Sequence, residues 1–391
     1  MWQLTNGVRF YPWGSRTVIP ELLGQPVPAD RPHAELWIGA HPDEPSTLAD
    51  GRPLNLAIDA DPEALLGAPV VARFGARLPF LMKVLAAETP LSLQAHPTPE
   101  QARAGFAAEE TAGIPHGDPT RTFKDPFHKP ELLLALTPFE ALCGFRPVEE
   151  SLHCLAKLQV PELKPTIAAL ARGGLRAVIP QLLGLSGKRR TALVSEVARA
   201  AGRFVAAHDP EFINTYRWAS SLAATYPGDA GVVITLMCNH LTREPGEAIV
   251  LPAGNLHAYL CGAGVEVMAS SDNVLRGGLT AKHVDLAALI EVLDFTDGRV
   301  PVLHPVLGPG GLRYPVPVED FDLTRCELDA QAGVLTTLGP QLLLCTEGTA
   351  VLASADGELT LKKGQSAFVP AGAPVSVRGP AVLYRATTHL T

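Results

Sequence analysis

Short apolar segments separated by proline and glycine make up the first part of the chain, up to about Arg146. Residues 35–39, 78–85 and 131–136 are three such segments, and turn-forming residues lie between them. Closely spaced strands with turn signals are typical of a β-sandwich or a β-barrel. We therefore predict a β module of this kind in the first part of the chain.

The pattern changes between about Pro147 and Tyr226, where alanine- and leucine-rich stretches carry apolar residues three and four positions apart. This spacing predicts amphipathic helices. Within residues 188–207 the apolar positions form one stripe: Leu193, Val194, Val197, Ala201, Phe204 and Val205. Because proline interrupts helices, this helical insert should be divided into pieces by three prolines: Pro161, Pro165 and Pro180.

Strand and turn character returns after Pro245, together with a weak internal repeat. Residues 245–254 align without gaps on residues 363–372, and each copy has a turn glycine, a strand and a Pro-Ala-Gly turn. Five residues beyond the proline, the first copy has His257 whereas the second has Val375. We therefore predict two modules of related architecture. The second module lacks the side chain that could bind a metal.

These patterns predict a mainly β protein with a helical insert, built from two β-barrel or jelly-roll modules plus an α-helical domain. The first module is expected to comprise residues 1–146 and 241–312, the helical domain residues 147–240, and the second module residues 313–391. A chain of 391 residues with 47% hydrophobic residues can bury the cores that such domains need.

Composition excludes several classes of function. The net charge is −8 and no basic run exceeds Lys188-Arg189-Arg190, so we expect no nucleic-acid partner. No apolar run approaches the roughly 20 residues that span a bilayer, and the N-terminus has no signal-peptide pattern, so we expect no membrane association. The six cysteines are scattered without a C-x-x-C pair, which favours free thiols in a cytoplasmic protein.

Short segments carry the residue types of a metal site. Gln94 and His96 lie two positions apart in a predicted strand, so both side chains point to the same face. Glu131 begins a buried apolar run, where a carboxylate requires a counter-charge from a metal or from Lys129. A simple Glu–Lys surface pair is the alternative. A Pro-Gly turn delivers His257 to the start of the next strand, an arrangement typical of metal-bearing cupin barrels.

Another segment, residues 266–280, is a polar, glycine-ended stretch that contains a lone arginine, Arg276. Its fixed positive charge and planar guanidinium suit the binding of negatively charged oxygen atoms. A structural pair with Asp272, four residues earlier, is the alternative interpretation.

Together, these segments resemble the signature stretches of the type I mannose-6-phosphate isomerases, which are zinc-dependent. Residues 11–14 and 34–42 also resemble that family's opening segments, and the likeness extends to about Asp285, interrupted by the helical insert. The resemblance implies cupin-type modules and one Zn²⁺ per chain, bound by four ligands: Gln94, His96, Glu131 and His257. It also implies an essential role for Arg276.

The resemblance further implies the reaction, which is the interconversion of mannose 6-phosphate and fructose 6-phosphate through a cis-enediol or enediolate. Such an enzyme supplies mannose 6-phosphate for mannose metabolism, GDP-mannose and glycan precursors. Four residues fall at positions considered in the family for proton transfer or phosphate contact: His128, Lys129, Glu266 and Asp272. For the phosphate, cations and polar groups at the cavity edge are the candidates: Ser92, Lys83, Lys129 and Lys282. We expect the protein to be a monomer.

Two other functions remain open at the level of the sequence. Cupin barrels with histidine and glutamate ligands serve many chemistries, so an iron-dependent oxygenase is one alternative. The amide ligand and the absence of a third histidine argue against it. A non-catalytic sugar-phosphate sensor is the other alternative, and it would tolerate the loss of proton-transfer groups.

Overall fold

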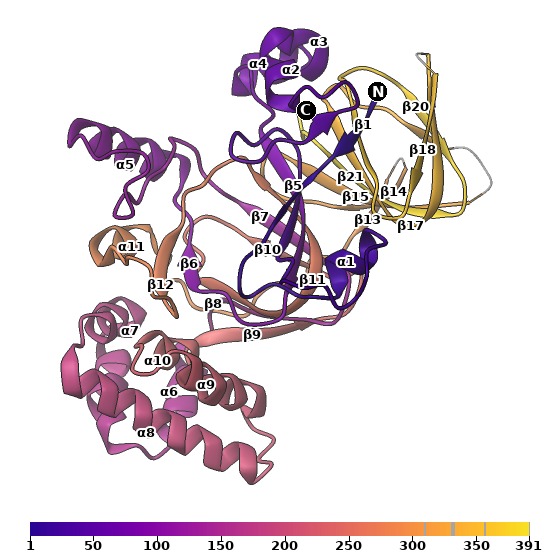
Figure 1. The fold of residues 1–391 in the computed structure, drawn as a ribbon. Helices are drawn as coiled ribbons and strands as arrows, with labels where there is room; N and C mark the ends of the chain where they lie inside the picture. The colour runs from indigo at the N-terminus through magenta and orange to yellow at the C-terminus, as the bar shows by residue number, and fades with distance from the viewer. Residues whose placement is uncertain (309, 330–332, 356, 391) are drawn as a thin grey trace.

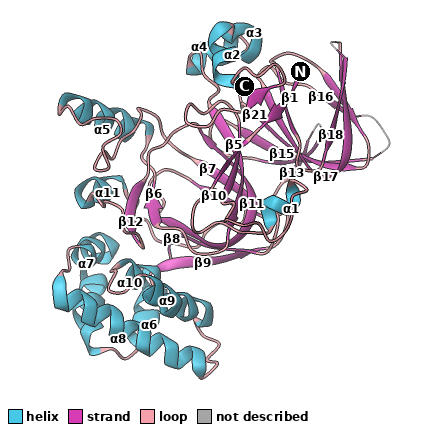
Figure 2. Cartoon of the chain, in the orientation of Figure 1, coloured by secondary structure: helices cyan, strands magenta, loops and turns pink. Residues whose placement is uncertain are grey.

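The computed structural model describes residues 1–308, 310–329, 333–355 and 357–390. Two antiparallel sheet modules lie against each other, and a cluster of helices extends from one end (Figure 1; Figure 2). Strand pairing among the described residues leaves both sheets open. A mainly β protein with a helical insert is therefore confirmed, and the modules are jelly-roll sheets rather than closed barrels.

The first module is a 10-stranded sheet whose main path runs β10-β7-β11-β5-β3-β2, with β6, β8, β9 and β12 paired beside it. Its strands are β2 (Gly7–Arg9), β3 (Glu35–Ile38), β5 (Phe80–Ala87), β6 (Leu93–Ala95), β7 (Glu131–Ala135), β8 (Phe139–Phe145), β9 (Cys238–Arg243), β10 (Ala248–Leu251), β11 (His257–Ala269) and β12 (Leu275–Gly278). Helices around it are α1 (Val18–Leu22), α2 (Leu54–Ala60), α3 (Pro62–Leu66), α4 (Ala68–Phe74), α5 (Pro99–Thr111) and α11 (Leu286–Val292).

The second module is an 11-stranded sheet formed mainly by the C-terminal part of the chain. Its strands there are β13 (Val306–Gly308), β14 (Gly311–Tyr314), β15 (Asp322–Leu328), β16 (Gly333–Leu335), β17 (Gln341–Ser354), β18 (Gly357–Lys362), β19 (Ser366–Val369), β20 (Val375–Arg378) and β21 (Ala381–Thr387). The N-terminal strand β1 (Trp2–Thr5) pairs with β19, and β4 (Thr47–Leu48) pairs with β1. The two ends of the chain therefore share one sheet.

Alternation along the strands explains why the two sheets stack. In β5, Met82 and Val84 point into a core shared with the second sheet, where Leu342 and Phe368 lie opposite them. The intervening Lys83 points to the other face, because successive side chains in a strand alternate. One face of the first sheet therefore holds the modules together, and the other is free to carry polar groups.

The helical insert contains α6 (Val148–Lys157), a 3-10 turn (Pro161–Leu163), α7 (Lys164–Leu183), α8 (Gly187–Ala206), α9 (Ile213–Thr225) and α10 (Gly231–Thr235). Helix α8 confirms the predicted stripe, since its buried residues include Leu193, Val194 and Val197. Pro161 and Pro165 lie at helix starts, as expected. The expectation for Pro180 was wrong, because α7 continues through it. The break in α7 occurs at Gly174, whose φ of +64° interrupts the helix.

The internal repeat is confirmed in the backbone. Gly254 and Gly372 both adopt positive φ, +77° and +71°, in the turns that follow β10 and β19. Each turn leads into a strand that begins at the position compared above, His257 in β11 and Val375 in β20. No described helix is long and apolar enough to cross a membrane.

Candidate metal centre

Three strands bring the predicted metal ligands together on the polar face of the first sheet. His96 follows β6, Glu131 begins β7 and His257 begins β11. Their side chains are at most 3% exposed. His257 lies opposite Gln94 in the β6–β11 pair, so these two side chains share a face. Among the described residues, His96, Glu131 and His257 form a group that could hold a metal ion.

The hydrogen bonds of the two histidines orient their free nitrogens toward the carboxylate. His96 Nδ1 lies 2.7 Å from the carbonyl oxygen of Asn273, and His257 Nδ1 lies 3.0 Å from that of Asn255. A carbonyl accepts only, so each Nδ1 carries the proton in a neutral ring. Each Nε2 therefore presents a lone pair, at 3.2 Å from Glu131 Oε1 for His96 and 3.5 Å from Glu131 Oε2 for His257.

In the resulting cluster, three acceptor atoms face one another and no hydrogen-bond donor of the described residues lies between them. Nε2 of His96, Nε2 of His257 and Oε2 of Glu131 are buried and have no hydrogen-bond partner. Buried polar atoms are normally satisfied, and three lone pairs facing one another repel. A divalent cation satisfies all three at once, and two imidazoles with a carboxylate are a usual zinc donor set. The residues present thus fit the metal that the sequence predicts.

Burial and charge hold these groups in the state that a metal requires. Burial lowers the pKa of His96 to about 4, although Glu131 acts in the opposite direction. Burial by itself favours the protonated acid of Glu131, but His96 and Lys129 outweigh it and hold its pKa well below the ordinary value. Neutral imidazoles and an ionised carboxylate are the forms that bind cations.

Arg276 lies one strand beyond Gln94. In the β6–β12 pair it is directly opposite Gln94, so both side chains point to the same side. Desolvation lowers the pKa of its guanidinium. Asp272, the alternative partner considered above, lies 3.3 Å from Nε2 of His41 instead. Among the described residues, Arg276 has no ion pair or hydrogen bond through its side chain.

A buried charged wall continues the site along β5 and β11. Lys83 Nζ lies 3.3 Å from Glu35 and 3.8 Å from Glu266. Glu266 accepts a 2.7 Å hydrogen bond from the hydroxyl of Tyr259. Lys129 Nζ lies 3.3 Å from Glu131. The predicted residues Lys83, Lys129 and Glu266 therefore lie on the same polar face as the predicted metal ligands.

Burial and neighbouring carboxylates raise the pKa of Glu266, whereas Lys83 lowers it. Burial and the negative charge of Glu131 raise the pKa of Glu266 to about 7, although Lys83 acts to lower it. Burial also disfavours the charge of Lys83, but Glu35 and Glu266 outweigh burial and raise its pKa.

Other predicted residues do not contact the group of His96, Glu131 and His257 in any hydrogen bond or ion pair of the described chain. His128 Nε2 lies 2.9 Å from Asp320, which precedes β15 of the second module. The hydrogen bond from His41 lowers the pKa of Asp272, although burial acts in the opposite direction. Ser92 lies just before β6 and is half-buried, whereas Lys282 is exposed on the turn after β12. Burial and the charge of Arg276 lower the pKa of Lys282.

Three contributors were not identified from the sequence alone. Asn273 holds His96 through its carbonyl, and its side chain bonds to the backbone of residues 124–127. Tyr259 shares the face of His257, two positions earlier, which is a spacing that could have indicated it. Glu35 bonds to both Lys83 and the indole of Trp37. A charged residue in an otherwise apolar strand was the available signal.

The fold and this site define the class as a cupin-type metalloprotein. Family models for the type I phosphomannose isomerase catalytic domain and the mannose-6-phosphate isomerase cupin domain match residues 1–148 and 311–387. Mannose-6-phosphate isomerase of Escherichia coli (strain K12) is 38% identical over 401 residues, covering 100% of both chains. The Rattus norvegicus enzyme is 33% identical, covering 95% of this chain and 93% of its own. The chain belongs to the type I mannose-6-phosphate isomerase family.

Solved structures agree with this membership. The mannose 6-phosphate isomerase from Salmonella typhimurium, bound to fructose 6-phosphate and zinc, has a TM-score of 0.91 and 37% identity, covering 100% of both chains. A zinc-bound mannose 6-phosphate isomerase also has a TM-score of 0.91, with 36% identity over 100% of this chain and 99% of its own.

Proposed function

We propose that this protein interconverts mannose 6-phosphate and fructose 6-phosphate with one zinc ion per chain. The observation that carries the proposal is the group of three buried lone pairs without partners, contributed by His96, Glu131 and His257. We assign Gln94 as the fourth ligand, because strand pairing places it beside His257. The full-length similarity to named isomerases supports the substrate pair.

The ligand set explains the chemistry that the zinc would supply. Two imidazoles, one amide and one carboxylate leave a formal charge of +1 on a divalent ion, and such a Lewis acid stabilises negative charge on the sugar oxygens as a proton moves between C1 and C2. The buried side chains around the site exclude water, which strengthens these electrostatic effects.

We assign the proton transfer to the charged wall. Glu266 is buried, receives a hydrogen bond from Tyr259, and has a pKa of about 7. A carboxyl group with a pKa close to the working pH suits general acid–base catalysis. Lys129, beside Glu131, is a second proton carrier in this proposal. His128 and Asp272 bond to Asp320 and His41 and are less suited to the role.

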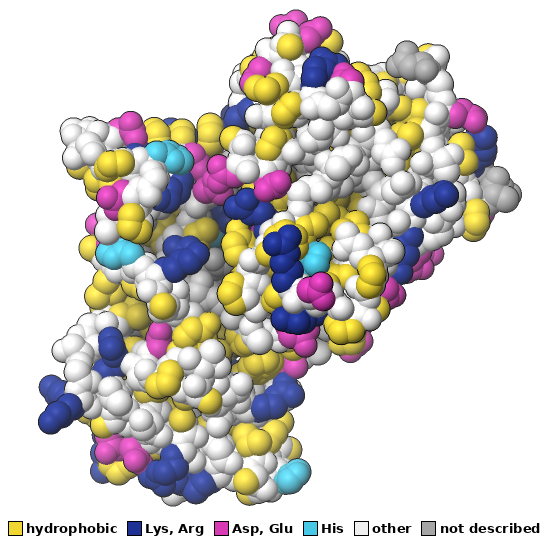
Figure 3. Space-filling model, viewed as in Figure 1, with side chains coloured by type: hydrophobic (Ala, Val, Ile, Leu, Met, Phe, Trp, Pro, Cys, Tyr) yellow, Lys and Arg dark blue, Asp and Glu magenta, His cyan; other side chains and the backbone are white. Residues whose placement is uncertain are grey.

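We assign the binding of the negatively charged part of the substrate to the cations that lie beyond Gln94. Arg276 has no carboxylate partner among the residues that the structure describes, and its planar guanidinium suits an enediolate or phosphate oxygen. Lys282 is close enough for the charge of Arg276 to affect it, so both cations could contact one anionic substrate. Ser92 would add a hydroxyl donor, and Lys83 would act through Glu266 rather than by touching the phosphate. Figure 3 shows lysine and arginine side chains beside a hollow between the helical end and the sheets.

Metal removal tests this function directly. Protein treated with chelator should lose conversion of mannose 6-phosphate to fructose 6-phosphate and regain it with zinc. Full activity after complete metal removal would contradict the proposal. Stoichiometric iron with oxygen uptake would support the oxygenase alternative, and zinc binding without turnover would support the sensor.

We also propose domain boundaries, a monomeric state and a cytoplasmic location for the protein. The domain division into residues 1–146 with 241–312, 147–240 and 313–391 is supported by the run of helices from α6 to α10, although β9 (Cys238–Arg243) already begins before residue 241 and β13 (Val306–Gly308) pairs in the second sheet. All six cysteines are free, which is consistent with a reducing cytoplasm. Sedimentation should give one species with the mass of a single chain, 41.4 kDa.

A further inference from the structure

The turn that follows Arg276 has a strained backbone. Strand β12 ends at Gly278, whose φ is +128°, and the next residue, Leu279, adopts a φ of +55°. A left-handed conformation is uncommon for a leucine and persists only where surrounding contacts enforce it. Leu279 is 1% exposed. Some part of the structure must therefore hold this turn.

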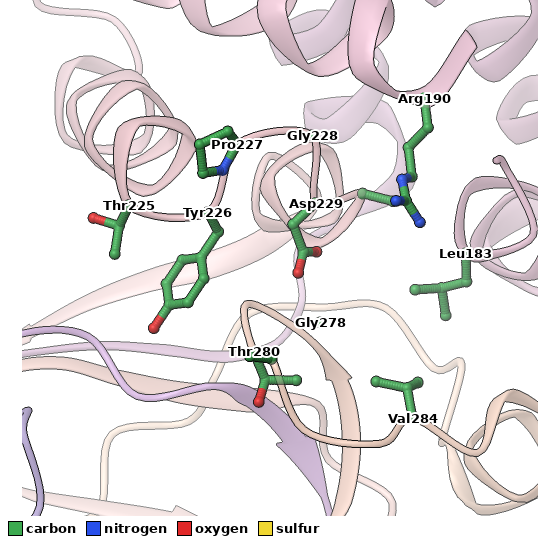
Figure 4. A pocket seen from close by; sticks show the side chains of 12 residues that line it. Leu183, Arg190, Thr225, Tyr226, Pro227, Gly228, Asp229, Gly278, Thr280 and Val284 are labelled. Carbon is green, nitrogen blue, oxygen red and sulfur yellow. The ribbon is translucent and has the colours of Figure 1, made fainter. Parts of the chain in front are cut away.

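Asp229 of the helical insert makes the contact that holds it. Its Oδ2 accepts a 2.8 Å hydrogen bond from the backbone N–H of Leu279, and its Oδ1 accepts one of 2.7 Å from Gly231. Asp229 lies in the loop between α9 and α10 and, together with Gly278 and Thr280, lines a pocket of about 450 Å³. In Figure 4 its carboxyl group points toward the loop that carries Gly278 and Thr280.

Two glycines allow the insert and the turn to approach this closely. A Cβ atom on Gly278 would lie 2.8 Å from Oδ1 of Asp229 and 3.0 Å from Cα of Gly231. A Cβ atom on Gly231 would lie 3.3 Å from Cα of Gly278. The two backbones are therefore in direct contact, and the carboxylate of Asp229 bridges them.

The turn also carries the cations assigned to the substrate. Arg276 precedes Gly278 by two residues, and Lys282 follows Leu279 by three. Burial, and after it the charge of Arg276, lowers the pKa of Lys282, so the two cations disfavour each other. Like charges with no carboxylate partner move apart unless the backbone fixes them.

We propose that Asp229 is a positioning residue for the isomerase reaction, and that the helical insert braces the turn that holds Arg276 and Lys282. Asp229 acts through Leu279 and does not touch the substrate. This proposal rests on the proposed function, and it gives the insert a role in catalysis. Fixed placement of a charged group contributes strongly to catalysis, because the group need not reorganise during the reaction.

Two variants of the zinc-loaded enzyme test the placement. Asp229→Ala removes both acceptors, and Asp229→Asn keeps the shape but leaves only one oxygen for the two N–H groups. Hydrogen exchange of residues 275–282 should become at least about tenfold faster in Asp229→Ala, with zinc content unchanged. The control is Asp61→Ala. Asp61 is another aspartate whose side chain accepts a hydrogen bond from a backbone N–H, that of Ala64 in α3. Unchanged exchange in both Asp229 variants would overturn the proposal.

A double-mutant cycle tests the catalytic part. Asp229→Ala should lower kcat about tenfold with a smaller change in KM, Asp229→Asn should lie between it and the wild type, and Asp61→Ala should leave kcat unchanged. In an Arg276→Ala background, Asp229→Ala should have less than about a twofold further effect, because both changes remove the same interaction. An undiminished tenfold effect in that background would overturn the positioning role.

The two measurements separate this proposal from the proposed function. A wild-type protein without isomerase activity would contradict the proposed function and the catalytic role of Asp229 together. Hydrogen exchange would then still decide whether Asp229 holds the turn.

Discussion

The segments after β10 and β19 share one backbone design but lead into interiors of opposite chemistry. Both pass through a Pro-Ala-Gly turn with a glycine at positive φ and then enter a strand. In the first module that strand starts with His257, which is 1% exposed beside Glu131. In the second it starts with Val375, which is fully buried.

The surroundings of each residue extend the contrast. Val375 packs in a core of aliphatic and thiol side chains that includes Leu343 and Val377. His257 lies on a face that also carries Lys83 and Glu266. The scaffold therefore tolerates either interior, and the side chains decide whether a module can bind a metal. An apolar interior stabilises the fold, whereas buried charges require partners or a cation.

The most severe test of this comparison makes the first module resemble the second. His257→Val removes one ligand and keeps the β11 backbone, so zinc should be lost and activity should fall by about three orders of magnitude or more. Metal analysis and the isomerase assay measure both effects. Val375→Ala is the matched control, and it should retain zinc and activity while lowering stability. Zinc retained at one ion per chain in His257→Val would refute the assigned ligand set.

A second test separates metal binding from catalysis within the first module. Arg276→Ala should reduce kcat by about 10²–10³-fold, because removing a preorganised charge-stabilising group has effects of this size. Zinc content should not change, since Arg276 is assigned no role as a ligand. Steady-state kinetics with metal analysis checks this. A variant with normal kcat would exclude Arg276 from the reaction.

Local patterns in the sequence predicted much of the scaffold and four candidate metal ligands, of which the structure brings His96, Glu131 and His257 together. Strands β3, β5 and β7 coincide with predicted apolar segments, because side-chain alternation and turn residues are local signals. Helix α5 was not predicted, although Thr98 and Gln101 form a capping box at its start. Its weakly amphipathic sequence gave little other indication.

Contacts between distant parts of the chain could not be predicted in this way. His128 was considered for catalysis, yet it bonds to Asp320, 192 positions away. The pairing of β1 with β19 likewise joins the two ends of the chain. Hydrophobic periodicity specifies which face of a strand is buried but not which strand lies next to it. The roles of residues around the metal therefore stay predictions until variants are measured.

A third test attempts to convert the second module. Val375→His places one imidazole in a core whose described members are aliphatic side chains and thiols, and burial raises the pKa of the thiols of Cys326 and Cys345, which keeps them protonated and disfavours zinc binding. Zinc should stay at one ion per chain. The unpaired, larger side chain should lower the free energy of unfolding by about 2–4 kcal/mol, as measured by denaturant titration. A second zinc ion would show that the repeat alone can create a site.

The smallest expected effect concerns the charged wall of the first module. In zinc-free protein the pKa of Glu266 is about 7, because burial and Glu131 raise it. The folded state thus holds a proton that the unfolded state releases near pH 4.5. This contribution to stability is complete below about pH 4.5 and is lost as the pH rises through 7.

Glu266→Gln removes the titration, so the free energy of unfolding of the wild type should fall by up to about 3 kcal/mol relative to this variant across that range. Zinc should reduce the difference, since it offsets the charge of Glu131 that acts on Glu266. Parallel stability curves for zinc-free wild type and Glu266→Gln would show that Glu266 is already ionised, and a carboxylate fully ionised well below neutral pH would be a weaker base for the proton transfer assigned to it.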